Sequence, residues 1–368
     1  MYPYLSKSSM HIIQIVPRLP PAIDGVGDYA YCLARQMRQD FGIQTYFIGC
    51  DPNGIRAADL DGFPVSWLDR HSAFDLFSLL KHHPGVNILL HYVGYGYAKR
   101  GCPTWLVNAL DQWHSSNSNA RLVTMFHEVY ASGPPWSSSF WLSSLQKQLA
   151  TRLARLSDHC VTSKDLYAKI LQQMSQGKHT QISALPVFST IGEPEQVLQL
   201  QDRDRQLVIF GRPGNRLQVY QSSLKKLTHI CENLNIQKVL DIGAPIGQTP
   251  SSVSGVPIIK MGSKTAAQLS NLFSTSIAGF LDYNSDYLGK STIFAAYCAY
   301  GMLPISAQCS TQTIDGIVPG KHYWFLDQSQ TDPKNWAELQ AIADNAHFWY
   351  QTHSLSIQTK VFVARFAG

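Results

Sequence analysis

Short apolar runs alternate with amphipathic stretches along the first half of the chain. The runs are rich in β-branched and aromatic side chains and cover residues 11–16, 45–49, 87–93, 121–127 and 159–163. The segments between them, such as 29–39 and 140–156, carry apolar side chains at helical spacing. This alternation is typical of βα units around a parallel sheet. It predicts a Rossmann-like, doubly wound α/β domain.

The same pattern begins again after a polar, charged stretch at residues 193–206. The apolar runs of this second half cover residues 206–211, 238–243, 256–262, 276–283 and 302–306. Since 368 residues exceed what one hydrophobic core usually spans, we expect two domains. The break is predicted near residue 200, with one Rossmann-like domain over 1–200 and another over 201–344.

The two ends of the chain depart from this alternation. Residues 1–9 precede the first apolar run and are interpreted as an extension outside the fold. Residues 345–368 form an amphipathic helical pattern. This predicted helix either closes the second domain or crosses back to the first.

Composition narrows the class of protein. Hydrophobic residues make up 45% of the chain and charged residues only 15%, which excludes disorder. The formal net charge of +5 is scattered along the sequence rather than gathered with aromatics, so nucleic acid is not expected as a partner. A mild positive excess fits an anionic substrate or loose contact with an acidic membrane surface.

The seven cysteines are odd in number and include no C-x-x-C pair. They are interpreted as reduced thiols, with no metal-ligand spacing among them. The sequence has no signal-peptide pattern and no apolar run long enough to span a bilayer. We therefore expect a cytoplasmic protein, with peripheral contact to the inner face of a membrane as an option.

Two glycines stand where the first predicted strand gives way to a helix. Gly25 and Gly27 would let a ligand approach the backbone, and the helix N-terminus would offer N–H groups to an anion or to sugar hydroxyls. An ordinary tight βα turn is the alternative interpretation. The spacing is not G-x-G-x-x-G, which argues against a nicotinamide dehydrogenase.

Two histidines, His91 and His127, stand at the predicted carboxyl ends of strands. Doubly wound folds bind ligands at that edge of the sheet, so both are site candidates, although structural histidines also occur there. Glu128 is a candidate acid or base. Tyr95, within the aromatic and glycine series 91–97, is a candidate wall for an acceptor sugar, and core packing is the alternative.

In the second half, Arg212 and Arg216 follow the first predicted strand. Guanidinium groups bind phosphate oxygens bidentately, so the pair fits a diphosphate leaving group, unless both are simply exposed loop residues. Lys290, Ser291 and Thr292 open a later helix and are candidates for a phosphate cradle. The upstream glycine of a P-loop is missing, which argues against an ATPase.

Several segments together carry a family resemblance: GVGDYAYCLA (25–34), the strand-end His127, SDHCVTSK (157–164), FGRPGNR (210–216) and AAYCAYGMLPIS (295–306). They resemble the retaining, nucleotide-sugar-dependent glycosyltransferases of the GT-B fold, group 1 or family 4. The likeness covers nearly the whole chain after Met10 and implies two Rossmann-like domains facing across a cleft. It also implies a hexosyltransferase-type enzyme of polysaccharide biosynthesis.

The resemblance implies roles for the candidate residues. Gly25 and Gly27 would line the donor phosphates and the acceptor, and His127 would contact the donor sugar. Arg212 or Arg216 would neutralise the departing diphosphate.

The resemblance also implies what the protein binds. The backbone around Ser291 and Thr292 would hold the distal phosphate. Neither a metal nor a cofactor would be needed, because Arg or Lys and a helix N-terminus take the place of the cation. The partners would be a nucleotide-diphosphate sugar and a saccharide or lipid-linked acceptor.

The sequence departs from the family at its two motif glutamates. Their positions are occupied by Leu288 and Ala296, and Asp282 or Asp286 is a candidate replacement. This absence motivates a second hypothesis: a degenerate GT-B protein that binds a glycan or nucleotide, or partners an active transferase, without turnover.

A third hypothesis is another GT-B chemistry. Nucleotide-sugar epimerisation, or inverting transfer with Glu128 or Asp28 as base, would use the same fold.

Acceptor choice is expected in the loops 98–103 and 132–140. In the second loop Pro134, Pro135 and Trp136 suggest a stiff, apolar surface, hence a lipid-bearing acceptor and membrane contact, or only a packed loop.

Overall fold

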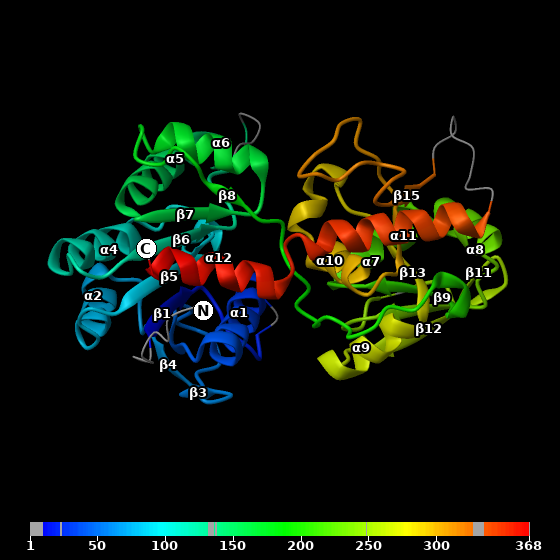
Figure 1. Cartoon of the computed structure of the whole chain (residues 1–368), viewed down its shortest axis with the longest axis horizontal. Helices are drawn as coiled ribbons and strands as arrows, with labels where there is room; N and C mark the ends of the chain where they lie inside the picture. Colours follow the sequence, from blue (N-terminus) through cyan, green and yellow to red (C-terminus); the bar gives the residue numbers. More distant parts are fainter. Residues whose placement is uncertain are drawn as a thin grey trace, which may run out of the picture. The chain divides into compact units, whose positions relative to one another are not determined.

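The chain divides into two compact units (Figure 1). The computed structural model describes residues 10–22, 24–131, 136, 138–247, 249–326 and 335–367. Unit 1 comprises Met1–Leu185 and Leu355–Gly368, and unit 2 comprises Pro186–Ser354. The predicted extension over residues 1–9 lies outside the described residues.

Unit 1 is built on an eight-stranded sheet in the order β3-β4-β2-β1-β5-β6-β7-β8. Every neighbouring pair is parallel except β3 with β4. The strands are β1 (His11–Val16), β2 (Gln44–Gly49), β3 (Asp59–Leu60), β4 (Phe63–Trp67), β5 (Asn87–Tyr92), β6 (Leu122–Phe126), β7 (His159–Thr162) and β8 (Ser183–Ala184). Because strand order reverses between β1 and β5, their carboxyl ends form a topological switch point.

Helices cover both faces of this sheet. The helices are α1 (Gly25–Phe41), α2 (Ala73–Lys81), α3 (Gly94–Tyr97), α4 (Thr104–Ser116), α5 (Ser138–Leu156), α6 (Asp165–Met174) and α12 (Leu355–Ala367). α1 and α12 pack together on one face, while α2, α4, α5 and α6 pack side by side on the other. Each face therefore has its own apolar cluster.

Unit 2 repeats this architecture with a seven-stranded sheet in the order β11-β12-β10-β9-β13-β14-β15. Its strands are β9 (Asp204–Phe210), β10 (Lys238–Ile242), β11 (Ser252–Val253), β12 (Val256–Gly262), β13 (Ser276–Leu281), β14 (Leu303–Ser306) and β15 (Trp324–Phe325). All neighbours are parallel except β11 with β12. Here the strand order reverses between β9 and β13.

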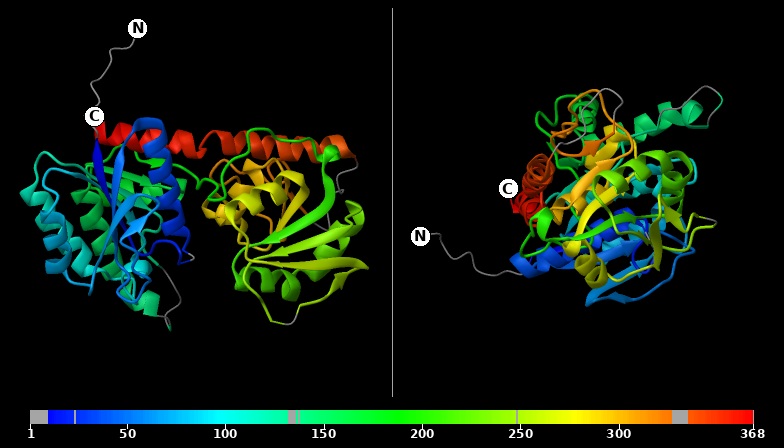
Figure 2. Two further views of the ribbon diagram at one scale, coloured as in Figure 1. Left: turned by 90° about the horizontal axis from the view of Figure 1, so that it is seen from below. Right: turned by 90° about the vertical axis from the view of Figure 1, so that its right-hand side faces the viewer.

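The helices of unit 2 pack around its sheet (Figure 2). Its large apolar cluster includes side chains of both strands and helices. They are α7 (Pro213–Ser222), α8 (Leu224–Asn233), α9 (Ala266–Thr275), α10 (Thr292–Ala299) and α11 (Trp336–Gln351), with 3-10 turns η1 (Leu200–Asp202) and η2 (Ser285–Lys290). The two doubly wound α/β domains predicted from the sequence are confirmed.

The boundary between the units lies earlier than the predicted break near residue 200. The polar stretch 193–206 packs into unit 2 because Arg203, which is buried, donates to backbone carbonyl oxygens of Leu198, Phe273, Ser276 and Tyr300. Burial lowers the pKa of Arg203 to about 10. The charge of Arg203 made this segment resemble a linker in the sequence. In the structure the hydrogen bonds of Arg203 attach the segment to unit 2.

The segment predicted as one helix over residues 345–368 is two helices. α11 belongs to unit 2, and α12 belongs to unit 1, where it packs on α1. The buried Tyr29 hydroxyl of α1 donates to Oε1 of Gln358 on α12 at 2.6 Å. The chain therefore passes between the units twice.

Candidate functional site

A pocket lies at the topological switch point of unit 2, at the carboxyl ends of β9 and β13. Its walls come from these two strands and from the first turns of α7 and α10. The lining residues are Ile209, Phe210, Asn215, Arg216, Val219, Phe280, Leu281, Asp282, Tyr283, Ser291 and Ile293. The fold thus brings together Arg216, Asp282 and Ser291, which the sequence singled out. Crevices at this position are the usual ligand sites of doubly wound sheets.

Arg216 is buried and forms an ion pair within unit 2. Its side chain is 3% exposed, and Nε donates to Oδ1 of Asp241 at 2.6 Å. Nη1 donates to the Ala244 carbonyl oxygen at 2.7 Å, and Tyr220 donates to the other oxygen of Asp241 at 3.0 Å. This ion pair holds the loop after β9 against the end of β10. The two arginines predicted as an equivalent pair are thus different, since the charge of Arg216 is already balanced.

Arg212 is the exposed member of the pair. It is the N-cap residue of α7, and its side chain makes no hydrogen bond to that helix end. A cation beside a helix N-terminus, where backbone N–H groups point outward, favours an anion. Of the two arginines, Arg212 therefore remains the better candidate for the predicted phosphate contact.

The hydroxyl and carboxylate candidates of the pocket have internal partners. Ser291 caps α10, its Oγ accepting from the Phe294 N–H at 3.2 Å. Asp282 accepts from Ser223 Oγ and from Gln308 Nε2, both at 2.7 Å. The predicted Lys290 and Thr292 flank this cap and are half-buried. Asp282 is thus held as part of the pocket wall.

The positions of the two missing glutamates are filled with core side chains. Leu288 is 1% exposed and Ala296 is fully buried. Leu288 lies in η2 and Ala296 in α10. An acidic side chain at either position would be buried at an apolar place, which is costly for an unpaired carboxylate.

The carboxyl edge of unit 1 holds a chain of buried polar side chains. Nε2 of His91 faces Oε1 of Gln14 at 2.8 Å, and Nδ1 of His91 faces Nε2 of His127 at 3.2 Å. With the Gln14 oxygen as acceptor, neutral His91 carries its proton on Nε2, so its Nδ1 accepts from His127. Burial, and secondarily His127, lowers the pKa of His91 well below its ordinary value. The chain therefore fixes the tautomer of His127.

The two predicted histidines do meet, but only one is near the surface. His91 is fully buried, so it is removed from direct contact with an acceptor. His127 is 7% exposed, and the ring of Tyr29 packs edge-on against it at 5.1 Å between centroids. Glu128 follows His127 and is half-buried. Sequence reasoning missed Gln14, whose only signal was a polar residue inside an apolar strand.

The two candidate glycines lie in the first turn of α1, rather than before it as the sequence predicted, and they are not equivalent. Asp24 caps this helix, its Oδ1 accepting from the N–H groups of Val26 and Gly27 at 3.0 and 3.1 Å. These donors are therefore already paired with a carboxylate, which disfavours a phosphate at the same place. A Cβ added at Gly27 would lie 2.3 Å from the Arg18 carbonyl oxygen, whereas one added at Gly25 would meet nothing within 4 Å.

Gly27→Ala is expected to lower the free energy of unfolding by about 2 kcal/mol or more, because a backbone atom must move to admit the methyl group. Gly25→Ala is expected to be neutral, or to stabilise by roughly 0.5 kcal/mol through better helix propensity. Urea denaturation of both variants measures this. Equal effects at the two positions would show that α1 does not approach Arg18 as closely as described.

Tyr95, the candidate for an acceptor-side wall, lies on the surface. Its side chain is 42% exposed, and its hydroxyl accepts from Nε2 of Gln146 at 3.3 Å. The same Nε2 donates to the Arg100 carbonyl oxygen at 2.9 Å, which ties the loop 98–103 to α5. In the other predicted acceptor loop, residues 132–135 and 137 lie outside the described residues.

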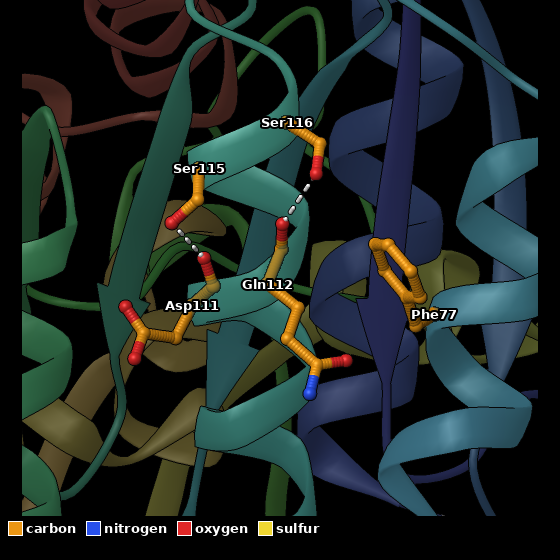
Figure 3. Close-up of a pocket in the computed structure, with 5 residues that line it drawn as sticks. All are labelled: Phe77, Asp111, Gln112, Ser115 and Ser116. Atoms are coloured by element: carbon orange, nitrogen blue, oxygen red, sulfur yellow. Dashed lines mark hydrogen bonds between the residues drawn. The ribbon is translucent and has the colours of Figure 1, made fainter.

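A second depression lies between α2 and α4 of unit 1 (Figure 3). It is lined by Phe77, Asp111, Gln112, Ser115 and Ser116. Both serine hydroxyls donate back to carbonyl oxygens of α4 at 2.9 Å. Because α4 ends here, before β6 begins, the depression lies at the amino edge of the sheet, away from the candidate residues.

Two further properties concern metals and membranes. Within the described residues, no cluster of three or more His, Cys, Asp or Glu side chains is arranged to hold a metal ion. Of the helices in the described ranges, none combines the length and apolarity needed to cross a membrane.

No protein-family model and no curated protein matches the sequence. Solved structures do match over nearly their whole length. A UDP-forming α,α-trehalose-phosphate synthase from Burkholderia vietnamiensis superposes with a TM-score of 0.60 at 11% identity, covering 98% of this chain and 97% of the other. The chain has the GT-B fold.

Other GT-B structures give the same result. The pneumococcal O-GlcNAc transferase GtfA, solved with UDP and GlcNAc, has a TM-score of 0.61 at 10% identity and covers 98% of this chain and 99% of its own. The UDP-GlcNAc 2-epimerase from Methanocaldococcus jannaschii has a TM-score of 0.55 at 10% identity, covering 97% and 98%. At such identities the likeness defines the fold, while activities differ among the structures that share it.

Proposed function

We propose that the protein is a glycosyltransferase that moves a sugar from a nucleotide-diphosphate donor to a saccharide or lipid-linked acceptor, with retention. The observation that carries this proposal is the pocket of unit 2. It lies at the switch point of the sheet, between the first turns of two helices, and the exposed Arg212 begins one of them. The GT-B transferases that share the fold are consistent with it.

The proposed chemistry divides between the units. In unit 2, Arg212 and the backbone N–H groups at the starts of α7 and α10 bind the diphosphate and stabilise its charge as it leaves, without a metal or cofactor. In unit 1, His127 and Glu128 interact with sugar hydroxyls. The seven free cysteines fit a cytoplasmic site of action.

A second candidate is a degenerate GT-B protein that binds its ligand without turnover. Two observations favour it: Leu288 and Ala296 fill the glutamate positions with buried apolar groups, and Arg216 is committed to Asp241. Under this proposal the pocket binds a nucleotide or glycan, but no sugar is transferred.

Calorimetric titration with UDP, GDP, ADP and their sugar conjugates tests the donor site. One base is expected to bind selectively, and Arg212→Ala is expected to weaken it tenfold or more, because a charge-assisted phosphate contact is lost. Lys225→Ala, an exposed cation on α8, is the matched control and should bind normally.

The results of the titration and of a transfer assay distinguish the transferase from the degenerate protein. Absence of binding by every nucleotide would overturn the donor site. Selective binding without transfer to any saccharide or lipid-linked acceptor would favour the degenerate protein. Where transfer occurs, a product with inverted anomeric configuration would exclude retention.

A further inference from the structure

Five exposed side chains of α5 form one stripe along the outward side of this helix. Trp141, Leu145, Gln148, Arg152 and Arg155 follow one another at intervals of four and three residues, which places them along one side of the helix. All five are exposed. The opposite side of α5 packs on the sheet through the buried Leu149, Ala150, Leu153 and Ala154.

The N-terminal end of the stripe is apolar and aromatic. Trp141 is 73% exposed and Leu145 is 37% exposed, and two neighbours, Phe140 and Trp136, are 45% and 86% exposed. The rings of Phe140 and Trp141 meet edge to face, with centroids 5.5 Å apart. In the right-hand view of Figure 2 the first turns of α5 project away from the sheet. Clustered exposure of large apolar side chains marks a surface that contacts something apolar.

The C-terminal end of the stripe is basic. α5 contains no Asp or Glu, and the C-terminal end of its stripe carries Arg152 and Arg155. Lys178 adds a third positive charge at this end, since its Nζ donates to the Arg155 carbonyl oxygen at 2.8 Å. Within the part of the chain that the structure describes, Arg152 forms an ion pair with Asp111, an exposed side chain 3.4 Å away. The positive charge of this end is therefore only partly offset.

We propose that this outward stripe of α5 docks unit 1 on an anionic lipid bilayer. Trp and Phe side chains favour the membrane interface, where the ring enters the headgroup region. From Trp141 to Arg155 the stripe extends about 21 Å along the helix, so aromatic insertion and phosphate contact occur side by side. A protein partner would be expected to cover a central apolar patch with a polar rim, rather than a stripe that is apolar at one end and basic at the other.

This docking surface goes beyond the proposed transfer reaction and does not depend on it. The stripe lies on a helix of unit 1, whereas the donor pocket is built by residues of unit 2. Loss of nucleotide binding would leave the docking surface intact, and loss of docking would leave the donor pocket intact.

Sedimentation with lipid vesicles tests the proposal on the full chain. Vesicles of pure phosphatidylcholine are compared with vesicles in which about a third of the lipid is phosphatidylglycerol, at low and high salt. We expect binding to the anionic vesicles that weakens with salt. Trp141→Ser is expected to lower the partition coefficient about tenfold, by analogy with the transfer of a large apolar side chain.

The charge arm uses Arg152→Gln together with Arg155→Gln. The double variant is expected to lower binding to the anionic vesicles about thirtyfold, because each positive charge near an anionic surface strengthens binding about fivefold. Binding to neutral vesicles should be unchanged. Phe348→Ser is the matched control, because Phe348 on α11 of unit 2 is 71% exposed and lies outside the stripe. Each variant is accepted only with an unchanged circular dichroism spectrum and melting temperature.

Three results would overturn the proposal. The first is no binding to either vesicle, and the second is equal loss of binding by Trp141→Ser and Phe348→Ser. The third is a concentration-dependent dimer, measured by analytical ultracentrifugation, that Trp141→Ser dissociates. That last result would assign the stripe to contact between copies of the chain.

Discussion

Replacing Arg216 by methionine is expected to lower the free energy of unfolding by about 3–5 kcal/mol, because it leaves the carboxylate of Asp241 buried without its counter-charge. Asp241 is 1% exposed and keeps only the Tyr220 hydroxyl as a partner among the contacts described above. The loop after β9 also loses its link to the Ala244 carbonyl. Chemical denaturation followed by circular dichroism measures the loss.

Arg212→Met is the control, since it removes the same charge from an exposed position four residues earlier and should change stability by less than about 0.5 kcal/mol. A double variant, Arg216→Met with Asp241→Leu, should recover part of the loss because no buried charge remains. A near-neutral Arg216→Met would show that the guanidinium is free to bind a ligand, as the sequence first suggested.

Between pH 7 and pH 5 the free energy of unfolding is expected to fall by about 2 kcal/mol for each buried histidine that resists protonation, through proton linkage. His91 and His353 are the strongest cases. Burial lowers the pKa of His353 to about 3, and that of His91 well below its usual value. A depressed histidine pKa stabilises the fold above the unfolded pKa near 6.5, and this stability is lost as the pH drops below it.

His353→Gln tests the second of these groups by removing its titration. Urea denaturation at pH 7 and pH 5 should give a smaller pH-dependent loss in this variant than in the parent protein. An unchanged slope in His353→Gln would mean that His353 takes up its proton as readily in the folded state as in the unfolded state.

The periodicity of the sequence predicted the sheets well and the details of the sites poorly. The five apolar runs of each half became central strands, because buried parallel strands need continuous apolar sequence. The two-residue strands β3, β8, β11 and β15 were missed, since two residues carry no period. The five-residue strand β4 was missed as well. The break near residue 200 was wrong because charge alone did not reveal that Arg203 has buried carbonyl partners.

The candidate site shows the same limit. Arg212 and Arg216 are the same type of residue, four positions apart. Nothing in the sequence around them shows that one is buried and the other exposed. What separates them is Asp241, 25 residues beyond Arg216 in sequence, brought to it by the pairing of β9 with β10. Likewise Gln14 and His91 are 77 residues apart and meet only through the neighbouring β1 and β5. Such partners follow from tertiary structure alone.

Because α12 returns to unit 1, the two units can be completed only in a particular order during protein synthesis. A ribosome releases residues in sequence, and domains generally fold as units during synthesis. The strands of unit 1 are made first, but their covering helix α12 is made after all of unit 2. Until α12 has been made, the face of α1 that α12 covers in the final fold has no helix packed on it. The hydrogen bond from Tyr29 to Gln358 cannot form before then. Unit 2 is therefore complete on the nascent chain before unit 1, although unit 1 starts earlier.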